Sequence, residues 1–380
     1  MKTSICFVSS TRADYSLLLP SIKECLSRKS KGVKTSVIVT GSHTIKSQGE
    51  TINHFKKDKI PISYSFKILD KTDSKGVKDN FKKSFDGFFA AYEKIKPDVV
   101  VLLGDRYEIF CAAVTAHMKG IKVVHLHGGE LTLGAYDDAY RHSITKFSYL
   151  HFTASKNYRK RVIQLGENPR KVFNVGPLAR ESISHVKFLK KSELEKRLKL
   201  KLKQNVILAT FHPEIGSEEK NKQNLMNFIH VLGELENVSV LFTSPNLDFL
   251  GNEVKKLLKE KIKDFKNIAY FESLGFELYY SLMRFTKCVV GNSSSGIIEA
   301  PIMGVSSINI GKRQEGRDQE KTTVNSSFNK SELKNKIEKV LQQKKQSKKN
   351  IKNVSKPSKI IVNKIIEMCK KDISKKFYDL

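Results

Sequence analysis

The fold of this chain is indicated most clearly by one stretch, Cys288-Val289-Val290-Gly291-Asn292-Ser293-Ser294-Ser295-Gly296-Ile297-Ile298-Glu299-Ala300-Pro301. An apolar, β-branched run leads into a Gly/Asn/Ser cluster and then into residues with helical character. That order predicts a strand, a tight loop and a helix N-terminus. Small residues let the backbone approach a ligand closely, and free N–H groups at a helix start attract anions. The stretch is therefore either an ordinary strand-to-helix turn or a cradle for a phosphate group.

The same alternation of strands and helices runs through the rest of the chain in two blocks. Asp98 to Gly104 is the clearest strand of the first block, since an unbroken Val/Leu run is typical of parallel strands covered on both faces. The pattern breaks near Gly176-Pro177 and restarts at Asn205–Thr210. We therefore predict an α/β fold of two Rossmann-like, doubly wound parallel-sheet domains facing a central cleft, over residues 1–180 and 181–365.

Several less regular elements are also expected from the pattern. A strand is predicted within Ile62–Leu69, and an amphipathic helix over Phe81–Ile95. Two lysine-rich helices are expected near the C-terminus, over Ser331–Gln343 and Lys359–Lys371.

The composition describes a globular chain with a large positive charge. Its 380 residues include 69 Lys and Arg against 39 Asp and Glu, which gives a net charge of +30. A basic chain can bind nucleic acid, an anionic membrane or a phosphorylated small molecule. Neither a basic stripe interleaved with aromatic residues nor zinc-finger spacing is present, so we expect no nucleic-acid partner.

The cysteines and the apolar runs bear on the compartment. Five cysteines without a CxxC pair indicate neither a disulfide framework nor a cysteine zinc site, and fit a reducing cytoplasm. The N-terminal apolar run is too short for a signal peptide. Apolar runs also stay below the roughly 18–20 residues that span a membrane, so we expect a cytoplasmic protein without a membrane partner.

The first strand-to-helix turn argues against a dinucleotide cofactor. Ile5–Ser9 reads as a buried strand, and Ser10 to Tyr15 follow it without a glycine. The GxGxxG fingerprint of nicotinamide and flavin enzymes is therefore absent from this turn. Arg12 lies in the turn, where it either meets an anion or is an ordinary surface arginine.

Polar side chains gather at the predicted strand ends, where open α/β sheets bind their ligands. In the first half, Asp105 follows the clearest strand, and His127 and Glu130 follow the next one. Asp105 is either a catalytic group or a helix cap. In the second half, His212 and Arg313 accompany the serine loop. The first half thus suits proton chemistry, and the second suits gripping a phosphorylated ligand.

Three function classes are compatible with these residues. An enzyme acting on a nucleotide-sugar explains the serine loop, the missing GxGxxG and the carboxylates together. A metallohydrolase would use His125 and His127 with Asp105 and Asp137, although an H-x-H pair is a weak signal and His125 fits a core position better. A polyanion binder would be driven by net charge alone and would lose binding at moderate salt.

Seven motifs in one order carry a resemblance to a known family. They are Thr11-Arg12-Ala13-Asp14-Tyr15, Thr40-Gly41-Ser42-His43, Gly104-Asp105-Arg106-Tyr107-Glu108, His125-Leu126-His127-Gly128-Gly129-Glu130, Arg141-His142-Ser143-Ile144-Thr145-Lys146, Gly291-Asn292-Ser293-Ser294-Ser295-Gly296 and Arg313-Gln314-Glu315-Gly316-Arg317. The chain resembles, over roughly residues 5–320, the hydrolysing UDP-N-acetylglucosamine 2-epimerases of bacterial sialic-acid and legionaminic-acid pathways. The resemblance implies a GT-B-like fold whose C-terminal helix, within residues 366–380, packs back on the first domain.

The resemblance also implies a reaction. UDP-N-acetylglucosamine and water would give N-acetylmannosamine and UDP through a 2-acetamidoglucal, without a redox cofactor or a metal. One alternative is the same chemistry on a UDP- or GDP-linked 2,4-diacetamido-2,4,6-trideoxy sugar. A non-hydrolysing 2-epimerase is the next alternative, and a GT-B glycosyltransferase lies furthest away. We also expect a homo-oligomer, either a dimer or a tetramer.

Site residues follow from the matching motif positions. The resemblance implies catalytic roles for Asp105, Asp137, His212 and His127, although animal members of the family carry Glu at the position of His127. The positions implied to bind substrate or nucleotide are Arg12, Ser16, His43, Glu130, Arg141, His142, Asn292, Ser293, Ser294, Ser295, Gly296, Glu299 and Arg313.

Overall fold

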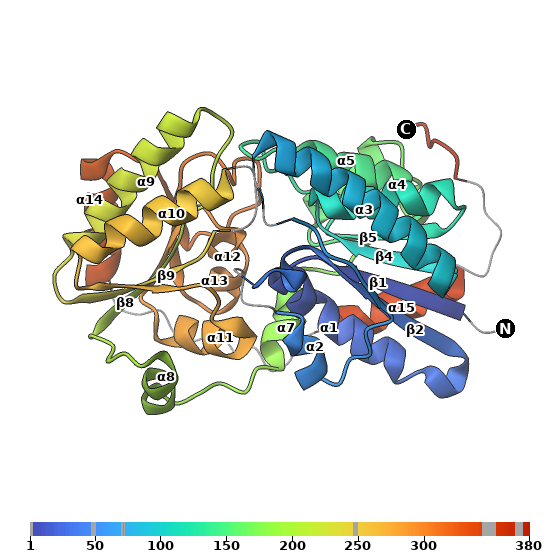
Figure 1. Ribbon diagram of the computed structural model, residues 1–380, viewed down its shortest axis with the longest axis horizontal. Coiled ribbons are helices and arrows are strands. Elements are labelled where there is room, and N and C mark those ends of the chain that lie inside the picture. The colour runs from blue at the N-terminus through green and yellow to red at the C-terminus, as the bar shows by residue number, and fades with distance from the viewer. Residues whose placement is uncertain are drawn as a thin grey trace.

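The structure, a computed structural model, describes residues 3–46, 51–69, 71, 73–245, 250–343, 355–368 and 375–380. The chain forms two lobes that lie side by side, each with a central sheet between helices (Figure 1). We call the lobe around the first sheet the N-terminal lobe and the lobe around the second sheet the C-terminal lobe.

All strand pairs in both sheets are parallel within the described residues. The N-terminal sheet contains β1 (Thr3–Ser9), β2 (Val33–Val39), β3 (Tyr64–Ser65), β4 (Val99–Leu103), β5 (Lys122–Leu126), β6 (Leu150–Thr153) and β7 (Val172–Asn174). The C-terminal sheet contains β8 (Asn205–Thr210), β9 (Val238–Thr243), β10 (Ile268–Phe271), β11 (Cys288–Gly291), β12 (Ser306–Ile310) and β13 (Thr323–Ser326).

The strand order identifies where a ligand would bind. It is β3-β2-β1-β4-β5-β6-β7 in the first sheet and β10-β9-β8-β11-β12-β13 in the second. In each sheet the order reverses once along the described strands, between β1 and β4 and between β8 and β11. The carboxyl ends of the strands open a crevice at such a switch point. The prediction of two doubly wound parallel sheets is confirmed.

Helices cover both faces of each sheet. The helices before the second sheet are α1 (Arg12–Leu26), α2 (Asn53–Lys57), α3 (Ser74–Ile95), α4 (Tyr107–Met118), α5 (Asp137–Phe147), α6 (Lys156–Gln164), α7 (Ala179–Ser184) and α8 (Lys191–Leu198). Those that follow are α9 (Glu218–Gly233), α10 (Gly251–Lys261), α11 (Gly275–Phe285), α12 (Ser294–Ile297), α13 (Glu299–Ile302), α14 (Lys330–Gln342) and α15 (Pro357–Met368). Short 3₁₀ helices are η1 (Lys29–Lys31), η2 (Gly41–Thr44), η4 (Pro169–Lys171) and η5 (Ile262–Asp264). None of the helices in the described ranges is long and apolar enough to cross a membrane.

The last helix returns to the N-terminal lobe, where α15 packs against α1 (Figure 1). Ile361, Val362 and Ile365 of α15 are fully buried in the core of that lobe. Burying each such side chain contributes about 1.5–3 kcal/mol. The carboxylate of Glu181 in α7 accepts hydrogen bonds from the Ser358 backbone N–H at 2.8 Å and from its hydroxyl at 2.6 Å, which fixes the start of α15.

The packing of α15 against the N-terminal lobe changes where the domain boundary should be placed. The expected boundary at residue 365 falls inside α15. Of the helix expected within residues 366–380, residues 369–374 lie outside the described residues, and Lys375–Leu380 carry no helix. We propose that α15 belongs with the first domain.

Three local expectations differ from the structure. The strand expected within Ile62–Leu69 is reduced to the short edge strand β3, which pairs with β2 alone among the described strands. The helix expected from Phe81 begins at Ser74, because the Asp73 side chain accepts the Gly76 N–H at 2.8 Å and caps it.

The helical part of the stretch Cys288–Pro301 is divided into α12 and α13, which meet at Ile298. Pro301 explains the break. Its ring would clash with the carbonyl of Ile297 in one continuous helix, whereas it is tolerated in the first turn of α13.

Candidate active site

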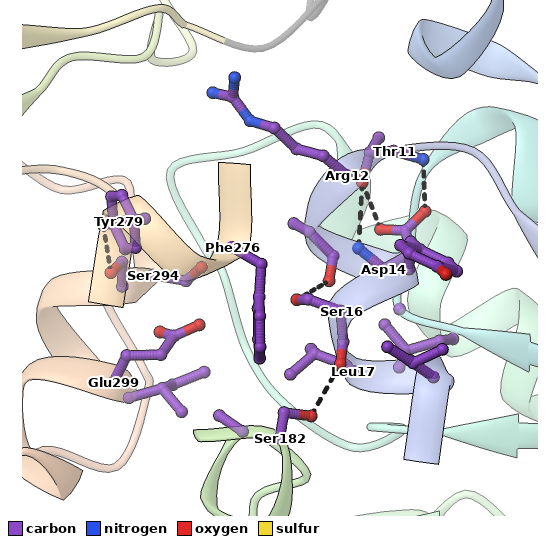
Figure 2. A pocket seen from close by; sticks show the side chains of 18 of the residues that line it. Thr11, Arg12, Asp14, Ser16, Leu17, Ser182, Phe276, Tyr279, Ser294 and Glu299 are labelled. Carbon is purple, nitrogen blue, oxygen red and sulfur yellow. Dashed lines mark hydrogen bonds between the residues drawn. The ribbon is translucent and has the colours of Figure 1, made fainter. Parts of the chain in front are cut away.

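The two switch points face one pocket with a volume of about 1090 Å³. The N-terminal lobe lines it with residues that follow β1, β4 and β5, and the C-terminal lobe with residues that follow β8 and β11. In Figure 2, Arg12, Ser16 and Leu17 of α1 lie on one side, and Phe276, Tyr279, Ser294 and Glu299 lie on the other. The pocket is therefore built from both halves of the chain.

Asp105 stands at the end of β4, where Gly104 turns the chain with a positive φ of 81°. Its Oδ2 accepts a hydrogen bond from Nη2 of Arg141, which is 1% exposed. Nη1 of Arg141 donates to the Glu130 carbonyl at 2.9 Å and to the Thr132 hydroxyl at 3.1 Å. The buried guanidinium thus fixes Asp105 at the pocket wall as one half of an ion pair.

His127 follows β5 in the left-handed region, with φ 64°. Its Nδ1 lies 2.7 Å from Oε1 of Glu130, and its Nε2 accepts the Leu178 N–H at 3.4 Å. Arg317, from the loop after β12, donates through Nη2 to Oε2 of Glu130 at 3.1 Å. Burial alone would raise the pKa of Glu130, but Arg317 and His127 outweigh it and lower that pKa below its ordinary value. Both His127 and Glu130 line the pocket.

The two neighbouring acidic residues at the start of α5, Asp137 and Asp138, lie in different surroundings. Asp137 lines the pocket, as expected. Asp138 instead accepts the Thr132 N–H at 2.6 Å and lies 3.5 Å from Nε2 of His142. His142 is outside the pocket lining, so the structure does not bring it to the site.

The serine loop meets the pocket on the opposite side. Ser293, Ser294 and Ser295 all line it. The Ser293 hydroxyl accepts the Ser295 N–H at 3.4 Å and caps α12, while the Ser295 hydroxyl lies 2.6 Å from the Tyr279 hydroxyl. Gly296 is buried outside the pocket lining, and a Cβ there would lie 3.6 Å from Cβ of Ser307. The part of the loop that faces the pocket is thus limited to the three serines.

Asn292 acts from beneath the pocket rather than in it. Its fully buried side chain accepts the His212 N–H at 2.7 Å and donates to the His212 carbonyl at 2.8 Å. A Cβ on Gly291 would lie 1.9 Å from the Thr210 carbonyl oxygen, so this close approach of β11 to β8 requires glycine. The two strand ends together hold His212, which lines the pocket.

Two further predicted residues complete this side. The Oε2 atom of Glu299 is buried without a hydrogen-bond partner in the described structure, and burial raises the pKa of this carboxyl group. Arg313 lines the pocket, and its backbone N–H and that of Lys312 each donate to Oε1 of Glu214 at 3.0 Å. Glu214 therefore anchors the loop that carries Arg313.

Of the predicted residues near β1 and β2, two reach the pocket and one does not. Arg12 donates through Nη1 to the Glu272 carbonyl in the C-terminal lobe at 2.6 Å, and Ser16 lines the pocket beside it. His43 is fully buried, with its ring nitrogens 2.9 Å from the Ser9 hydroxyl and 2.7 Å from that of Thr51. Burial lowers the pKa of His43 to about 3. It lies in the core outside the pocket lining.

Of the two histidines in the metallohydrolase alternative, His127 lines the pocket and His125 does not. His125 is fully buried, with Nε2 2.8 Å from the Gly104 carbonyl oxygen and Nδ1 3.1 Å from the Thr145 hydroxyl. In the described ranges, no group of three or more His, Cys, Asp or Glu residues is arranged to hold a metal ion.

Sequence reasoning missed several residues that the structure places at the site. Arg317, Tyr279 and Phe276 line the pocket, and Glu214 supports it. A signal existed for two of them. Arg317 ends the motif that begins at Arg313, and Glu214 follows His212-Pro213 directly. The two aromatic residues carry no local signal, because apolar positions of a helix usually face a core.

Known proteins resemble this chain along most of its length. The profile of the UDP-N-acetylglucosamine 2-epimerase family matches residues 26–359. A GDP/UDP-N,N'-diacetylbacillosamine 2-epimerase (hydrolyzing) of Campylobacter jejuni is 38% identical over 391 residues, which cover 100% of each chain. A UDP-N,N'-diacetylbacillosamine 2-epimerase (hydrolyzing) of Legionella pneumophila is 30% identical and covers 85% of each chain.

A solved structure supports the fold. The crystal structure of UDP-GlcNAc 2-epimerase from Neisseria meningitidis bound to UDP-GlcNAc matches with a TM-score of 0.77, over 97% of this chain and 100% of that one. At 16% identity this likeness concerns the fold alone, and it confirms the GT-B-like arrangement of two parallel-sheet lobes. Because the family profile spans most of the sequence and a relative is 38% identical from end to end, the chain belongs to the UDP-N-acetylglucosamine 2-epimerase family.

Proposed function

We propose that this chain is a hydrolysing 2-epimerase that acts on a nucleoside-diphosphate-linked 2-acetamido sugar and releases the nucleoside diphosphate. One observation carries the proposal. Asp105 and Asp137 line one pocket together with the three serines of the loop and Arg313. Groups suited to proton transfer and groups suited to holding a diphosphate would thus act on one ligand in this pocket.

Two sugar classes are candidates. A UDP- or GDP-linked 2,4-diacetamido-2,4,6-trideoxy sugar is supported by the two hydrolysing relatives, which are 38% and 30% identical. UDP-N-acetylglucosamine is supported by the description of the family profile. We place the diacetamido sugar first, because the 38% identity extends over the whole chain.

The proposed chemistry is an elimination followed by a hydration. A base removes the proton from C2 while the C1–O bond breaks, and its electron pair leaves with the diphosphate. The product of this step is a 2-acetamidoglucal. Water then adds at C1 and a proton returns to C2 from the opposite face, so the free sugar is inverted at C2. The overall reaction consumes one water molecule and needs no oxidant or reductant.

The residues fit these steps in distinct roles. Asp105, Asp137, His127 and His212 are proposed to carry protons and to stabilise the positive charge that develops at C1. Arg141 would hold Asp105 in place. Ser294 and Arg313 would bind the departing diphosphate, since hydroxyl and guanidinium donors suit phosphate oxygens.

Proton NMR of the reaction in D₂O tests the proposal. UDP-N-acetylglucosamine and the UDP- and GDP-linked diacetamido sugars are offered in parallel, with and without a chelator. We expect a free sugar with one deuterium at C2, a free nucleoside diphosphate and no effect of the chelator. A product that keeps its nucleotide would replace the proposal with a non-hydrolysing epimerase. Full retention of the C2 proton would exclude the elimination, and loss of activity with the chelator would favour the metallohydrolase.

A further inference from the structure

We propose that Arg317 of the C-terminal lobe positions His127 of the N-terminal lobe through Glu130, and so sets the tautomer and the basicity of this imidazole. The acid–base group would then be complete only where the two lobes meet. The kinetic consequence rests on the proposed function, whereas the tautomer and the basicity do not.

The contact chain is continuous and buried. Nη2 of Arg317 lies 3.1 Å from Oε2 of Glu130. The other carboxylate oxygen, Oε1, lies 2.7 Å from Nδ1 of His127. Glu130 is 2% exposed and His127 is 7% exposed. Nε and Nη1 of Arg317 are buried without a hydrogen-bond partner among the described residues. Within the described structure, the ion pair with Glu130 is therefore what compensates the burial of this guanidinium.

The hydrogen bonds select one tautomer. The Leu178 N–H can only donate, so Nε2 of His127 must present its lone pair. Nδ1 then carries the proton and donates it to Glu130. Glu130 thus orients the His127 ring, and Arg317 shares the negative charge of that carboxylate.

Other charged and titratable groups surround this pair. They are His125 on β5, Tyr158 on α6, Arg141 on α5 and Glu299 on α13. Burial lowers the pKa of His125 to about 3, so this ring stays neutral. The Tyr158 hydroxyl accepts the Asp318 N–H at 2.8 Å. Arg141 is tied to Asp105, so it does not replace the contact between Arg317 and Glu130.

The loop around Arg317 docks on the N-terminal lobe. Asp318 accepts the Ser155 hydroxyl at 2.7 Å, and the Leu133 N–H donates to the Glu315 carbonyl at 3.2 Å. A Cβ on Gly316, which has φ 88°, would lie 2.7 Å from Cβ of Leu131. These contacts hold the loop against the N-terminal lobe, so the Arg317 side chain reaches Glu130 within a buried interface between the lobes.

The test follows the imidazole directly. Protein with ¹⁵N-labelled histidine is titrated with acid and base in the absence of substrate, and the His127 signals are assigned from His127→Gln. The wild type should show the Nδ1–H tautomer. Arg317→Met should raise the apparent pKa of the His127–Glu130 pair, because the carboxylate is no longer shared. Glu130→Gln should lower it, and Arg317→Lys should restore most of the wild-type behaviour.

A matched control removes the same charge elsewhere. Arg284 lies on α11 of the C-terminal lobe, outside the pocket lining, with its guanidinium 4.4 Å from the centre of the Phe188 ring, and Arg284→Met should leave the His127 titration unchanged. If Arg317→Met does not fold, Arg317→Gln removes the same charge and carries the same expectation. An unchanged titration in a folded, charge-removing Arg317 variant, or an Nε2–H tautomer in the wild type, would overturn the proposal.

Kinetics separate this proposal from the proposed function. In Arg317→Met, the limb of the kcat–pH profile that belongs to His127 should move with the NMR pKa, while KM at the optimum changes less than threefold. An altered KM without a shifted limb would mean that Arg317 binds substrate instead. The expected NMR result with no turnover on any nucleotide-sugar would refute the proposed function and leave the positioning role intact.

Discussion

At the end of β4, the carboxylate of Asp105 is held by a buried guanidinium from the same lobe. At the end of β11, the Ser294 hydroxyl lines the pocket and the buried Oε2 of Glu299 has no hydrogen-bond partner in the described structure. The two switch points share a strand topology but treat their polar groups in opposite ways. Groups with internal partners are held in one geometry, whereas a group with unfilled hydrogen-bonding capacity gains a partner when a ligand arrives. The first arrangement suits a catalytic group that must be positioned in advance, and the second suits holding a ligand.

The largest expected effect tests the N-terminal switch point. Asp105→Asn keeps the shape of the side chain but removes its charge and its ability to take up a proton, so kcat should fall by at least ~10²-fold. Asp137→Asn should give a fall of the same order. Both variants are measured by steady-state kinetics on the preferred sugar, with circular dichroism to check the fold.

The control for Asp105 lies at the other end of the same strand. Asp98 accepts the Ser4 N–H at 2.7 Å, away from the pocket, and Asp98→Asn should leave kcat within about twofold. Near wild-type turnover of Asp105→Asn would remove Asp105 from the chemistry and weaken the contrast between the two switch points.

A smaller effect is expected at the C-terminal switch point. Arg313→Ala should weaken binding of the released nucleoside diphosphate by about 10- to 100-fold, because hydrogen bonds to charged groups contribute about 1.5–3 kcal/mol. Ser294→Ala loses a neutral hydroxyl and should weaken it by about 2- to 10-fold. Calorimetry with UDP and with GDP measures both losses, and unchanged affinity in the two variants would contradict the assignment of this side to the diphosphate.

The smallest effect concerns stability. Burial raises the pKa of Glu299 above its ordinary value of 4.5. At a pH between 4.5 and the raised pKa of the folded state, the Glu299 carboxyl group is ionised in the unfolded chain but protonated in the folded chain. The free energy of unfolding of the wild type therefore falls as pH rises through this range. Glu299→Gln has no such proton. Its Tm should match that of the wild type below about pH 4.5 and exceed it increasingly above that pH, up to the raised pKa. A Tm difference that does not change with pH would show that Glu299 is solvated or paired.

The sequence predicts the sheets well because their strands are continuous apolar runs. The same rule that places ligands at strand ends led to Asp105 and to the serine loop, and the structure puts both at the pocket. β13 was not anticipated, because Thr323-Val324-Asn325-Ser326 is a mostly polar edge strand without an apolar run. Pattern alone also could not show that the helical part of Cys288–Pro301 is interrupted, since that depends on the ring of one proline.

The side chains that contact partners far along the chain were the hardest to predict. His43 and His142 lie in motifs of the family resemblance, yet neither lines the pocket, because each is directed to a partner within its own lobe. Arg317 meets Glu130 only because the two lobes face each other. A local pattern shows that a residue is polar, but the direction of its side chain depends on tertiary packing.

The return of α15 to the N-terminal lobe has a consequence for synthesis of the chain. Ile361, Val362 and Ile365 leave the ribosome after every strand of both sheets, so the first lobe to emerge is the last to be completed. Until then the face of α1 that α15 covers stays open to water or to other chains. We expect a nascent chain stopped before Pro357 to be more prone to aggregate than the full chain, and a detached segment over 357–368 to bind to it.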